Sequence, residues 1–277
     1  MTEPFSTQKY LRNIKPPFCA GCGGYAVSNT FLRAVHELGH EDLRKFVFTS
    51  GIGCSSWIPS PHFLADSVHT LHGRSIPVAT GIKLTRPDAD VVVFGGDGDI
   101  VGIGLSHFVH AARRNLDVLV IMINNMVYGM TGGQVAPTTP YRTRTSTTPY
   151  GSFEYPLDAA KLAVTAGACY AARWTTLTIK ELKESIKTAL KMRGFRFIEV
   201  VSQCPTAFGR RAGFEDSAEM LKWFRENTIT LNHAEKMGED ELTSRIVVGE
   251  FVKRVKPTLV DTLYKSIEEA RRQVAED

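Results

Sequence analysis

The sequence has no long apolar run, little charge imbalance and few cysteines, and each shortage excludes a class of protein. No stretch reaches the roughly 20 apolar residues that a membrane-spanning helix requires, so we expect no membrane segment. The 33 basic and 29 acidic residues leave a formal charge of +4, too small an excess to indicate nucleic-acid binding. The first residues lack the apolar core of a signal peptide, which favours a cytoplasmic protein. Its five cysteines should then be reduced or bound to metal rather than paired.

What is present fits an ordinary α/β protein. The 277 residues, of which 43% are hydrophobic and 22% charged, suit one large domain or one domain with an appendage. The chain becomes richer in charge after Arg211 and has helical patterns near residues 216–226 and 259–275. We therefore predict an α/β domain over residues 1–209 and a C-terminal arm over residues 210–277 that packs on the core or on a partner.

Other elements are predicted from hydrophobic periodicity. The predicted helices are 26–38, 158–166 and 179–192, and the predicted strands are 45–49, 170–174 and 195–202. Residues 136–156 are rich in Thr, Pro and Tyr and show neither period. A loop of this length in a compact domain is typical of a functional segment.

The most informative stretch is a strand–helix–strand pattern in the middle of the chain. Residues 91–94 are an all-apolar run typical of a strand buried on both faces. The sharp turn 95–99 follows, and then a helical pattern with Ile103 on its apolar face. A second apolar run, 118–123, ends in the pair Asn124–Asn125. A carboxylate and two amides therefore follow neighbouring parallel strands, at the edge of the sheet where ligands bind.

These residue types suit magnesium bound to a diphosphate. Mg²⁺ prefers oxygen ligands, which Asp97, Asn125 and the backbone carbonyl of Val127 can supply. Gly96 and Gly98 have no Cβ, so a phosphate can approach the main chain and the N–H groups of the following helix. Taken alone, the GDG turn could simply carry a helix N-cap. Its spacing of 25 residues from the Asn pair resembles the motif of thiamine diphosphate (ThDP)-dependent enzymes.

Four cysteines are candidate metal ligands. Cys19 and Cys22 form a C-x-x-C in a glycine-rich turn, Cys54 lies in a second glycine loop, and Cys204 follows a predicted strand. From the residues alone, zinc, an iron–sulfur cluster, a redox dithiol and no metal all stay open. Cys169 lies among apolar neighbours in a predicted strand and is not expected to bind metal.

Several motifs together resemble the β subunits of 2-oxoacid:ferredoxin oxidoreductases over nearly the whole chain. They are CAGCG at 19–23, GIGCSS at 51–56, HGR at 72–74, GDGD at 96–99, NN and YGMTGGQ within 124–134, APTTP at 136–140 and QCP at 203–205. The resemblance implies an open, mostly parallel sheet of the ThDP-binding fold, with helices on both faces and a C-terminal helical arm.

The resemblance also implies roles for individual residues. One [4Fe–4S] cluster would be held by Cys19, Cys22, Cys54 and Cys204, and Mg²⁺ by Asp97, Asn125 and Val127. The ThDP site would be lined by Gly24, Cys54, Ser55, His72, Gly96, Asp97, Gly98, Asp99, Asn125, Val127, Tyr128, Gly129, Met130 and Thr131. His72 and Arg74 are candidate catalytic residues near the diphosphate or the substrate carboxylate, and a solvated or core role for them stays equally open.

The family's reaction is the coenzyme A-dependent oxidative decarboxylation of a 2-oxoacid, with electrons passed through the cluster to ferredoxin. The pattern most resembles members that convert 2-oxoglutarate to succinyl-CoA, a reaction that can also run as a CO₂-fixing synthase. Pyruvate and branched-chain 2-oxoacids stay open, and Arg74, Lys83 and Arg86 are candidate partners for a second substrate carboxylate.

The glutamate that activates ThDP is expected on a partner α subunit, in an (αβ)₂ assembly. Two other classes of protein stay open. A non-redox ThDP decarboxylase or synthase would need no cluster, and an interaction module stabilised by zinc would need no ThDP.

Overall fold

The computed structural model describes residues 4–15 and 17–276, and its centre is an eight-stranded sheet. The strand order is β2-β1-β3-β4-β8-β7-β10-β9, and only β10 and β7 pair antiparallel. The strands are β1 Phe46–Ser50, β2 Asp66–His69, β3 Asp90–Gly96, β4 Leu119–Asn124, β7 Tyr170–Thr175, β8 Arg196–Val201, β9 Thr228–Thr230 and β10 Ile246–Lys253. A separate antiparallel pair consists of β5 Val127–Tyr128 and β6 Gln134–Val135. The predicted open, mostly parallel sheet is confirmed.

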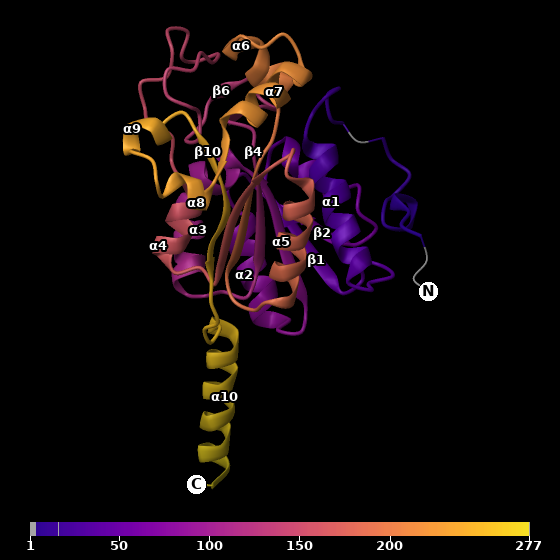
Figure 1. Ribbon diagram of the computed structural model, residues 1–277. Helices are drawn as coiled ribbons and strands as arrows, with labels where there is room; N and C mark the ends of the chain where they lie inside the picture. The colour runs from indigo at the N-terminus through magenta and orange to yellow at the C-terminus, as the bar shows by residue number, and fades with distance from the viewer. Residues whose placement is uncertain (1–3, 16, 277) are drawn as a thin grey trace.

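Helices cover both faces of this sheet (Figure 1). One face packs on α1 Gly24–Glu37 and α5 Ile179–Lys191, and the other on α2 Ser75–Thr85, α3 Leu105–Arg113 and α4 Ala159–Ala166. Successive residues of β3 alternate between the two cores, with Val92 and Phe94 on the α1 side and Val91 and Val93 on the α2 side. Because both sides are covered, the central strands β3 and β4 contain continuous apolar runs in sequence.

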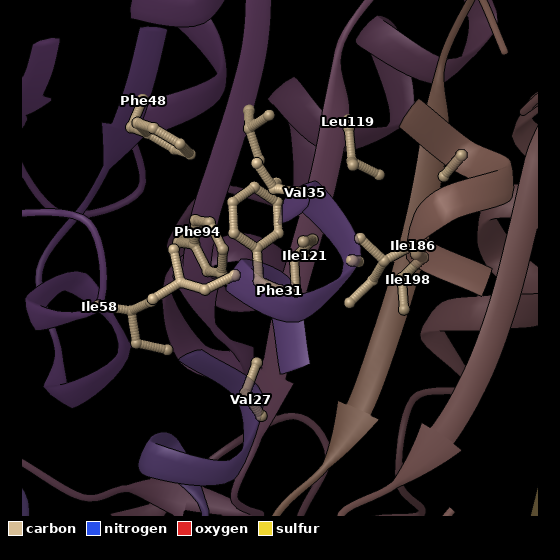
Figure 2. Close-up of a cluster of buried hydrophobic side chains, with 14 of the residues drawn as sticks. Val27, Phe31, Val35, Phe48, Ile58, Phe94, Leu119, Ile121, Ile186 and Ile198 are labelled. Carbon is tan, nitrogen blue, oxygen red and sulfur yellow. The ribbon is translucent and has the colours of Figure 1, made fainter. Parts of the chain in front are cut away.

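The core on the α1 side is built around an aromatic cluster. Phe31 lies on α1 and is fully buried, with its ring centroid 5.3 Å from that of Phe94 and 5.8 Å from those of Phe48 and Phe63. Figure 2 shows the ring of Phe31 directed toward Phe94 and Ile121, which lie on the sheet. Phe31 therefore holds α1 on the sheet together with the aliphatic side chains of Val27, Leu32 and Val35.

The structure differs from the sequence-based expectation at two places. Strand β2 was not predicted from the sequence, because most of its side chains are exposed and it shows no apolar alternation. Ile103 was expected on an apolar helix face but is 51% exposed. The π-helical turn η3, Gly98–Ile103, precedes α3 and places Ile103 outside the packed stripe. Residues 136–156 contain no helix or strand, as predicted.

The C-terminal region contributes more to the sheet than the sequence predicted. The two expected helices are present as α7 Ser217–Asn227 and α10 Leu259–Glu276. Between them, β9 and β10 extend the same sheet that residues before 209 build, so only α10 projects from the body as an arm (Figure 1). β10 was not predicted, because it contains Gly249 and its side chains are only partly buried, so the sequence shows no clear apolar alternation. The short helices are α6 Arg210–Ala212, α8 Leu231–Ala234 and α9 Glu239–Leu242.

None of the helices in the described part of the chain has the length and apolar character needed to cross a membrane.

Replacing Phe31 by Ala should lower the free energy of unfolding by about 3–5 kcal/mol, because it leaves a cavity among the buried rings of Phe48, Phe63 and Phe94. Denaturant titration followed by far-UV circular dichroism measures this change. Phe153→Ala serves as the control, since Phe153 is 68% exposed and its loss should change stability by less than about 0.5 kcal/mol. Equal midpoints for the two variants would contradict the assigned core.

Candidate functional site

The candidate residues meet where the loops after β1, β3, β4 and β8 lie together at the carboxyl edge of the sheet, and two adjoining cavities open there. The larger cavity, of about 170 Å³, is lined by Ile52, Gly53, Cys54, Ser55, His72, Gly96, Asp97, Gly98, Asp99, Asn125, Val127, Tyr128, Gly129, Met130 and Thr131. The smaller cavity, of about 80 Å³, has Gly24 and all four candidate cysteines on its wall. Cys54, Ser55, Asn125 and Gly129 line both cavities. The oxygen ligands and the sulfur ligands expected from the sequence therefore lie on two sides of one shared wall.

Three oxygen-bearing groups converge in the larger cavity. One end of the Asn125 side-chain amide lies 3.0 Å from Asp97 Oδ1 and 2.7 Å from the carbonyl oxygen of Val127. With its nitrogen at that end, the amide donates to both oxygens. With its oxygen there, three oxygens face one another, an arrangement that a cation between them would stabilise. This donor set fits Mg²⁺, which takes a few protein oxygens and completes its shell with phosphate and water.

A backbone kink directs Asn125 and Val127 to the same point. Met126 lies between them, is buried, and has a φ of 65°, in the left-handed region that non-glycine residues rarely adopt. The side-chain oxygen of Asn124 accepts a hydrogen bond from Met126 N at 3.0 Å, and Thr139 Oγ1 donates to Met126 O at 2.6 Å. The first Asn of the pair therefore shapes the loop, and the second directs its side-chain amide toward Asp97.

Asp97 is held by a threonine from the long loop. Thr138 Oγ1 donates a hydrogen bond to Asp97 Oδ2, which leaves Oδ1 for the convergence point. Burial raises the pKa of Asp97 to about 7, while the Thr138 hydroxyl and the Gly98 N–H act in the opposite direction. A divalent cation at the convergence point would favour the charged carboxylate. The loop 136–156 thus has a function at the site.

Glycines keep the cavity open. A Cβ on Gly98 would lie 2.2 Å from the Tyr128 ring. A Cβ on Gly129 would lie 2.8 Å from the Asn125 amide nitrogen, 3.8 Å from Cys54 Sγ and 3.9 Å from Cys204 Sγ. Only glycine at position 129 leaves the space between the amide and the thiols free.

The four cysteines surround the smaller cavity. Burial raises the pKa of Cys54 to about 11, with further contributions from the charges of Cys204, Cys22 and Cys19, and burial also raises the pKa of Cys22. The Gly24 N–H donates to Cys22 Sγ at 3.4 Å. Cys169 lies elsewhere, fully buried just before β7, with its thiol donating to Asn115 Oδ1 at 3.1 Å.

The spacing of these thiols distinguishes between kinds of metal. Among the described residues, no three or more His, Cys, Asp or Glu side chains are arranged to hold a single metal ion. Four thiols around a cavity, rather than around a point, suit a polynuclear cluster with four cysteine ligands.

Not every predicted residue reaches the site. His72 lines the larger cavity, but Arg74 does not and is exposed. Burial lowers the pKa of His107, and the positive charge of Arg74 lowers it further. Lys83 is buried against Asp117 at 3.1 Å, near the opposite edge of the sheet. Arg86 pairs with Asp88 on the surface. Lys83 and Arg86 are therefore excluded as partners for a substrate in this cavity.

Asp99 also connects the loops beside the larger cavity. Its side chain turns to the neighbouring loops, where Oδ1 accepts hydrogen bonds from Gly73 N at 2.6 Å, His72 Nδ1 at 3.0 Å and Ile52 N at 3.3 Å. Asp99 lies on the wall of the larger cavity, and these contacts are made within the protein.

The residues that support the turn 124–127 were not predicted from the sequence. Thr138 and Thr139 belong to the APTTP motif, which was noted only as a mark of resemblance. Glu199 accepts a hydrogen bond from Asn124 Nδ2 at 2.7 Å, and nothing in the sequence connects these two residues. The pairing of β4 with β8 brings them together.

A buried carboxylate and an amide after neighbouring parallel strands, with glycines beside them, define the ThDP-binding domain of ThDP-dependent enzymes. The family model described as "Thiamine pyrophosphate enzyme, C-terminal TPP binding domain" matches residues 51–200.

Individual relatives narrow the class. The 2-oxoglutarate synthase subunit KorB of Methanocaldococcus jannaschii is 51% identical over 96% of this chain and 98% of the relative. A 2-oxoacid:ferredoxin oxidoreductase subunit beta from Saccharolobus solfataricus is 45% identical over 68% of this chain and 62% of the relative. A solved 2-oxoglutarate:ferredoxin oxidoreductase from Magnetococcus marinus, with 2-oxoglutarate, coenzyme A and succinyl-CoA bound, superposes with a TM-score of 0.84 at 34% identity, covering 97% of this chain and 92% of that chain. The chain belongs to the family of 2-oxoacid:ferredoxin oxidoreductase β subunits.

Thr138→Val should weaken the binding of Mg²⁺ and ThDP by about tenfold, the lower end of the range for lost outer-shell partners of metal ligands. Valine keeps the shape of threonine but leaves Asp97 Oδ2 without its donor. Thr138→Ser retains the hydroxyl and should bind nearly as tightly as the wild type. Calorimetric ThDP titration of the assembled enzyme at fixed Mg²⁺ compares the three proteins, and equal affinities for Val and Ser would refute this role of Thr138.

Proposed function

We propose that this chain is the catalytic β subunit of a 2-oxoglutarate:ferredoxin oxidoreductase. The enzyme converts 2-oxoglutarate and coenzyme A to succinyl-CoA and CO₂ and passes two electrons, one at a time, to ferredoxin. The observation that carries this proposal is the shared wall of Cys54, Ser55, Asn125 and Gly129 between an oxygen-lined and a thiol-lined cavity. A ThDP site and an electron-accepting cluster then lie side by side. The reverse, CO₂-fixing direction uses the same site.

Each group of residues has one task in this proposal. Asp97, Asn125 and the Val127 carbonyl hold Mg²⁺, and Gly96 and Gly98 admit the diphosphate to the main chain. Cys19, Cys22, Cys54 and Cys204 hold one [4Fe–4S] cluster. When bound, ThDP supplies the carbon nucleophile and the electron sink for decarboxylation. Buried Met126 and Thr138 keep the ligand oxygens in place before the cofactor arrives.

The composition of the larger cavity supports the need for a partner. Among its described lining residues there is no Glu, Lys or Arg. A ThDP-activating glutamate and a cation for the second carboxylate of 2-oxoglutarate must then come from another chain. The KorB relatives are named as subunits, which fits an αβ enzyme, and we propose an (αβ)₂ assembly. Pyruvate and branched-chain 2-oxoacids are the alternative substrates. Residues of the other chain would decide between them and 2-oxoglutarate.

The chain expressed alone, and loaded with every cofactor, should not reduce a low-potential dye with any 2-oxoacid. Co-expression with its α subunit should give turnover that depends on coenzyme A and prefers 2-oxoglutarate over pyruvate by at least about tenfold. Anaerobic dye-reduction assays with both substrates measure this. Turnover by the single chain would contradict the divided site, and a preference for pyruvate would reassign the substrate.

Serine substitutions test the cluster. Replacing Cys19, Cys22, Cys54 or Cys204 should lower the iron and sulfide content and the visible absorbance of the anaerobically purified protein. Cys169→Ser is the matched control, because this cysteine is buried away from the cavity, and its iron content should equal that of the wild type. One zinc per chain in the wild type, or full iron retention in the Cys204 variant, would overturn the assignment. A colourless protein that still binds ThDP would favour a non-redox ThDP enzyme.

A further inference from the structure

One oxygen of the Asp99 carboxylate, Oδ1, is fully engaged within the protein. The side chain is buried, and its Oδ1 accepts from three donors on two loops, His72 Nδ1, Gly73 N and Ile52 N. Its Oδ2 has no hydrogen-bond partner in the described part of the chain. That atom lies 2.2 Å and 2.9 Å from the positions that Cβ atoms on Gly51 and Gly95 would take. A side chain at either glycine would overlap the Asp99 carboxylate, so glycine at positions 51 and 95 is what allows Asp99 to occupy this space.

The contact with Asp99 fixes the protonation of one histidine. A carboxylate only accepts hydrogen bonds, so the bond between His72 Nδ1 and Asp99 Oδ1 at 3.0 Å requires the proton on Nδ1. In a neutral imidazole the other nitrogen, Nε2, is then a hydrogen-bond acceptor. His72 is 34% exposed in its side chain, lines the larger cavity, and meets the Tyr128 ring edge-on at 6.0 Å between centroids. Since Nδ1 is engaged with Asp99, Nε2 is the ring nitrogen left for the cavity.

We propose that Asp99 is a positioning residue that holds His72 in the Nδ1-protonated tautomer and so presents Nε2 to the cavity as a hydrogen-bond acceptor. Its partner is an N–H or O–H group of the molecule bound there. The sequence resemblance placed Asp99 among the residues that line the ThDP site, and its action through His72 is additional. The identity of that molecule as ThDP or the 2-oxoacid rests on the proposed function, whereas the tautomer and the direction of the ring do not.

A purely structural role is the competing explanation. Asp99 also holds Ile52 N and Gly73 N, and Ile52 lies two residues before Cys54. A brace between loops would affect stability and cluster content, and His72 would then be a bystander. The two explanations differ in whether the effect of Asp99 passes through Nε2 of His72.

Two substitutions at position 72 separate the ring nitrogens. The amide of His72→Asn can take the place of Nδ1 and keep the contact with Asp99, but it does not reach the position of Nε2. The amide of His72→Gln reaches the position of Nε2 and gives up the contact with Asp99. If Nε2 is the working atom, the Gln variant should have a kcat/KM for 2-oxoglutarate at least about tenfold above that of the Asn variant. Equal values, or a more active Asn variant, would overturn the proposal.

A double-mutant cycle tests whether Asp99 acts through His72. Asp99→Ala should lower kcat/KM of the αβ complex by about tenfold or more when His72 is present, and by less than about twofold in the His72→Asn background. Equal losses in both backgrounds would assign Asp99 to bracing alone. Asp99→Asn keeps an oxygen for all three donors and should retain most of the activity, so the cycle also has a variant that preserves the loops.

Asp117→Asn is the matched control for loss of a buried carboxylate. Asp117 pairs with Lys83 and Arg196 just before β4, at the opposite edge of the sheet from His72. This variant should have a lower melting temperature with an unchanged kcat/KM per folded complex. A similar loss of kcat/KM in Asp117→Asn would mean that reduced stability alone explains the Asp99 effect, and would overturn the proposal.

The tautomer can be read without any activity. In the full chain labelled with ¹⁵N-histidine, the signal that disappears in His72→Asn should show a protonated Nδ1 and an unprotonated Nε2. In Asp99→Ala the proton should move largely to Nε2. An Nε2-protonated wild type, or no change in the variant, would overturn the proposal. If the wild-type αβ complex fails to turn over 2-oxoglutarate, the proposed function fails, and this measurement still decides the role of Asp99.

Discussion

The site depends on one strained residue in the turn that follows β4. Met126 adopts a left-handed backbone conformation although it has a side chain, and this costs on the order of 1–3 kcal/mol. The strain is offset by hydrogen bonds on both of its peptide groups, from Thr139 and to Asn124. Only with this kink do the Asn125 amide and the Val127 carbonyl face Asp97 together. The oxygen set is thus preorganised by the backbone, and the long loop 136–156 is part of what maintains it.

Behind this turn lies a buried ionic network that makes the kink rigid. Asn124 binds Glu199, and Glu199 also pairs with Arg173 at 2.7 Å, while Arg173 reaches Asp158 at the start of α4. Burial alone would lower the pKa of Arg173, but the two carboxylates raise it, so the guanidinium stays charged. Removing one member of such a network leaves an uncompensated buried charge, which is strongly unfavourable. The turn 124–127 is therefore fixed to the sheet by charge as well as by packing.

Much of the fold was predictable, because the central strands follow simple rules. β3 and β4 contain continuous apolar runs, β8 is fully buried, and α1 and α5 are amphipathic helices, so period and burial agree. β2 and β10 were missed because many of their side chains are exposed and their apolar alternation is weak. Ile103 was misplaced because a π-helical turn shifts the phase of the helix by a fraction of a turn. Local patterns cannot reveal an edge pairing or a phase shift that distant contacts impose.

The sequence by itself determined which side chains are candidates for the chemistry of the site. The types and spacing of Asp97, Asn125 and the four cysteines indicate an oxygen-ligated cation and a thiolate-ligated metal, because few other residues can bind either. Only the tertiary structure decided how these groups are supported and which polar residues take part. It assigned Asp99 to His72, joined Thr138 to Asp97, and removed Lys83 and Arg74 from the cavity. The physical reason is that hydrogen-bond partners are chosen by distance in space, and residues 27 or 41 positions apart meet only when the sheet forms.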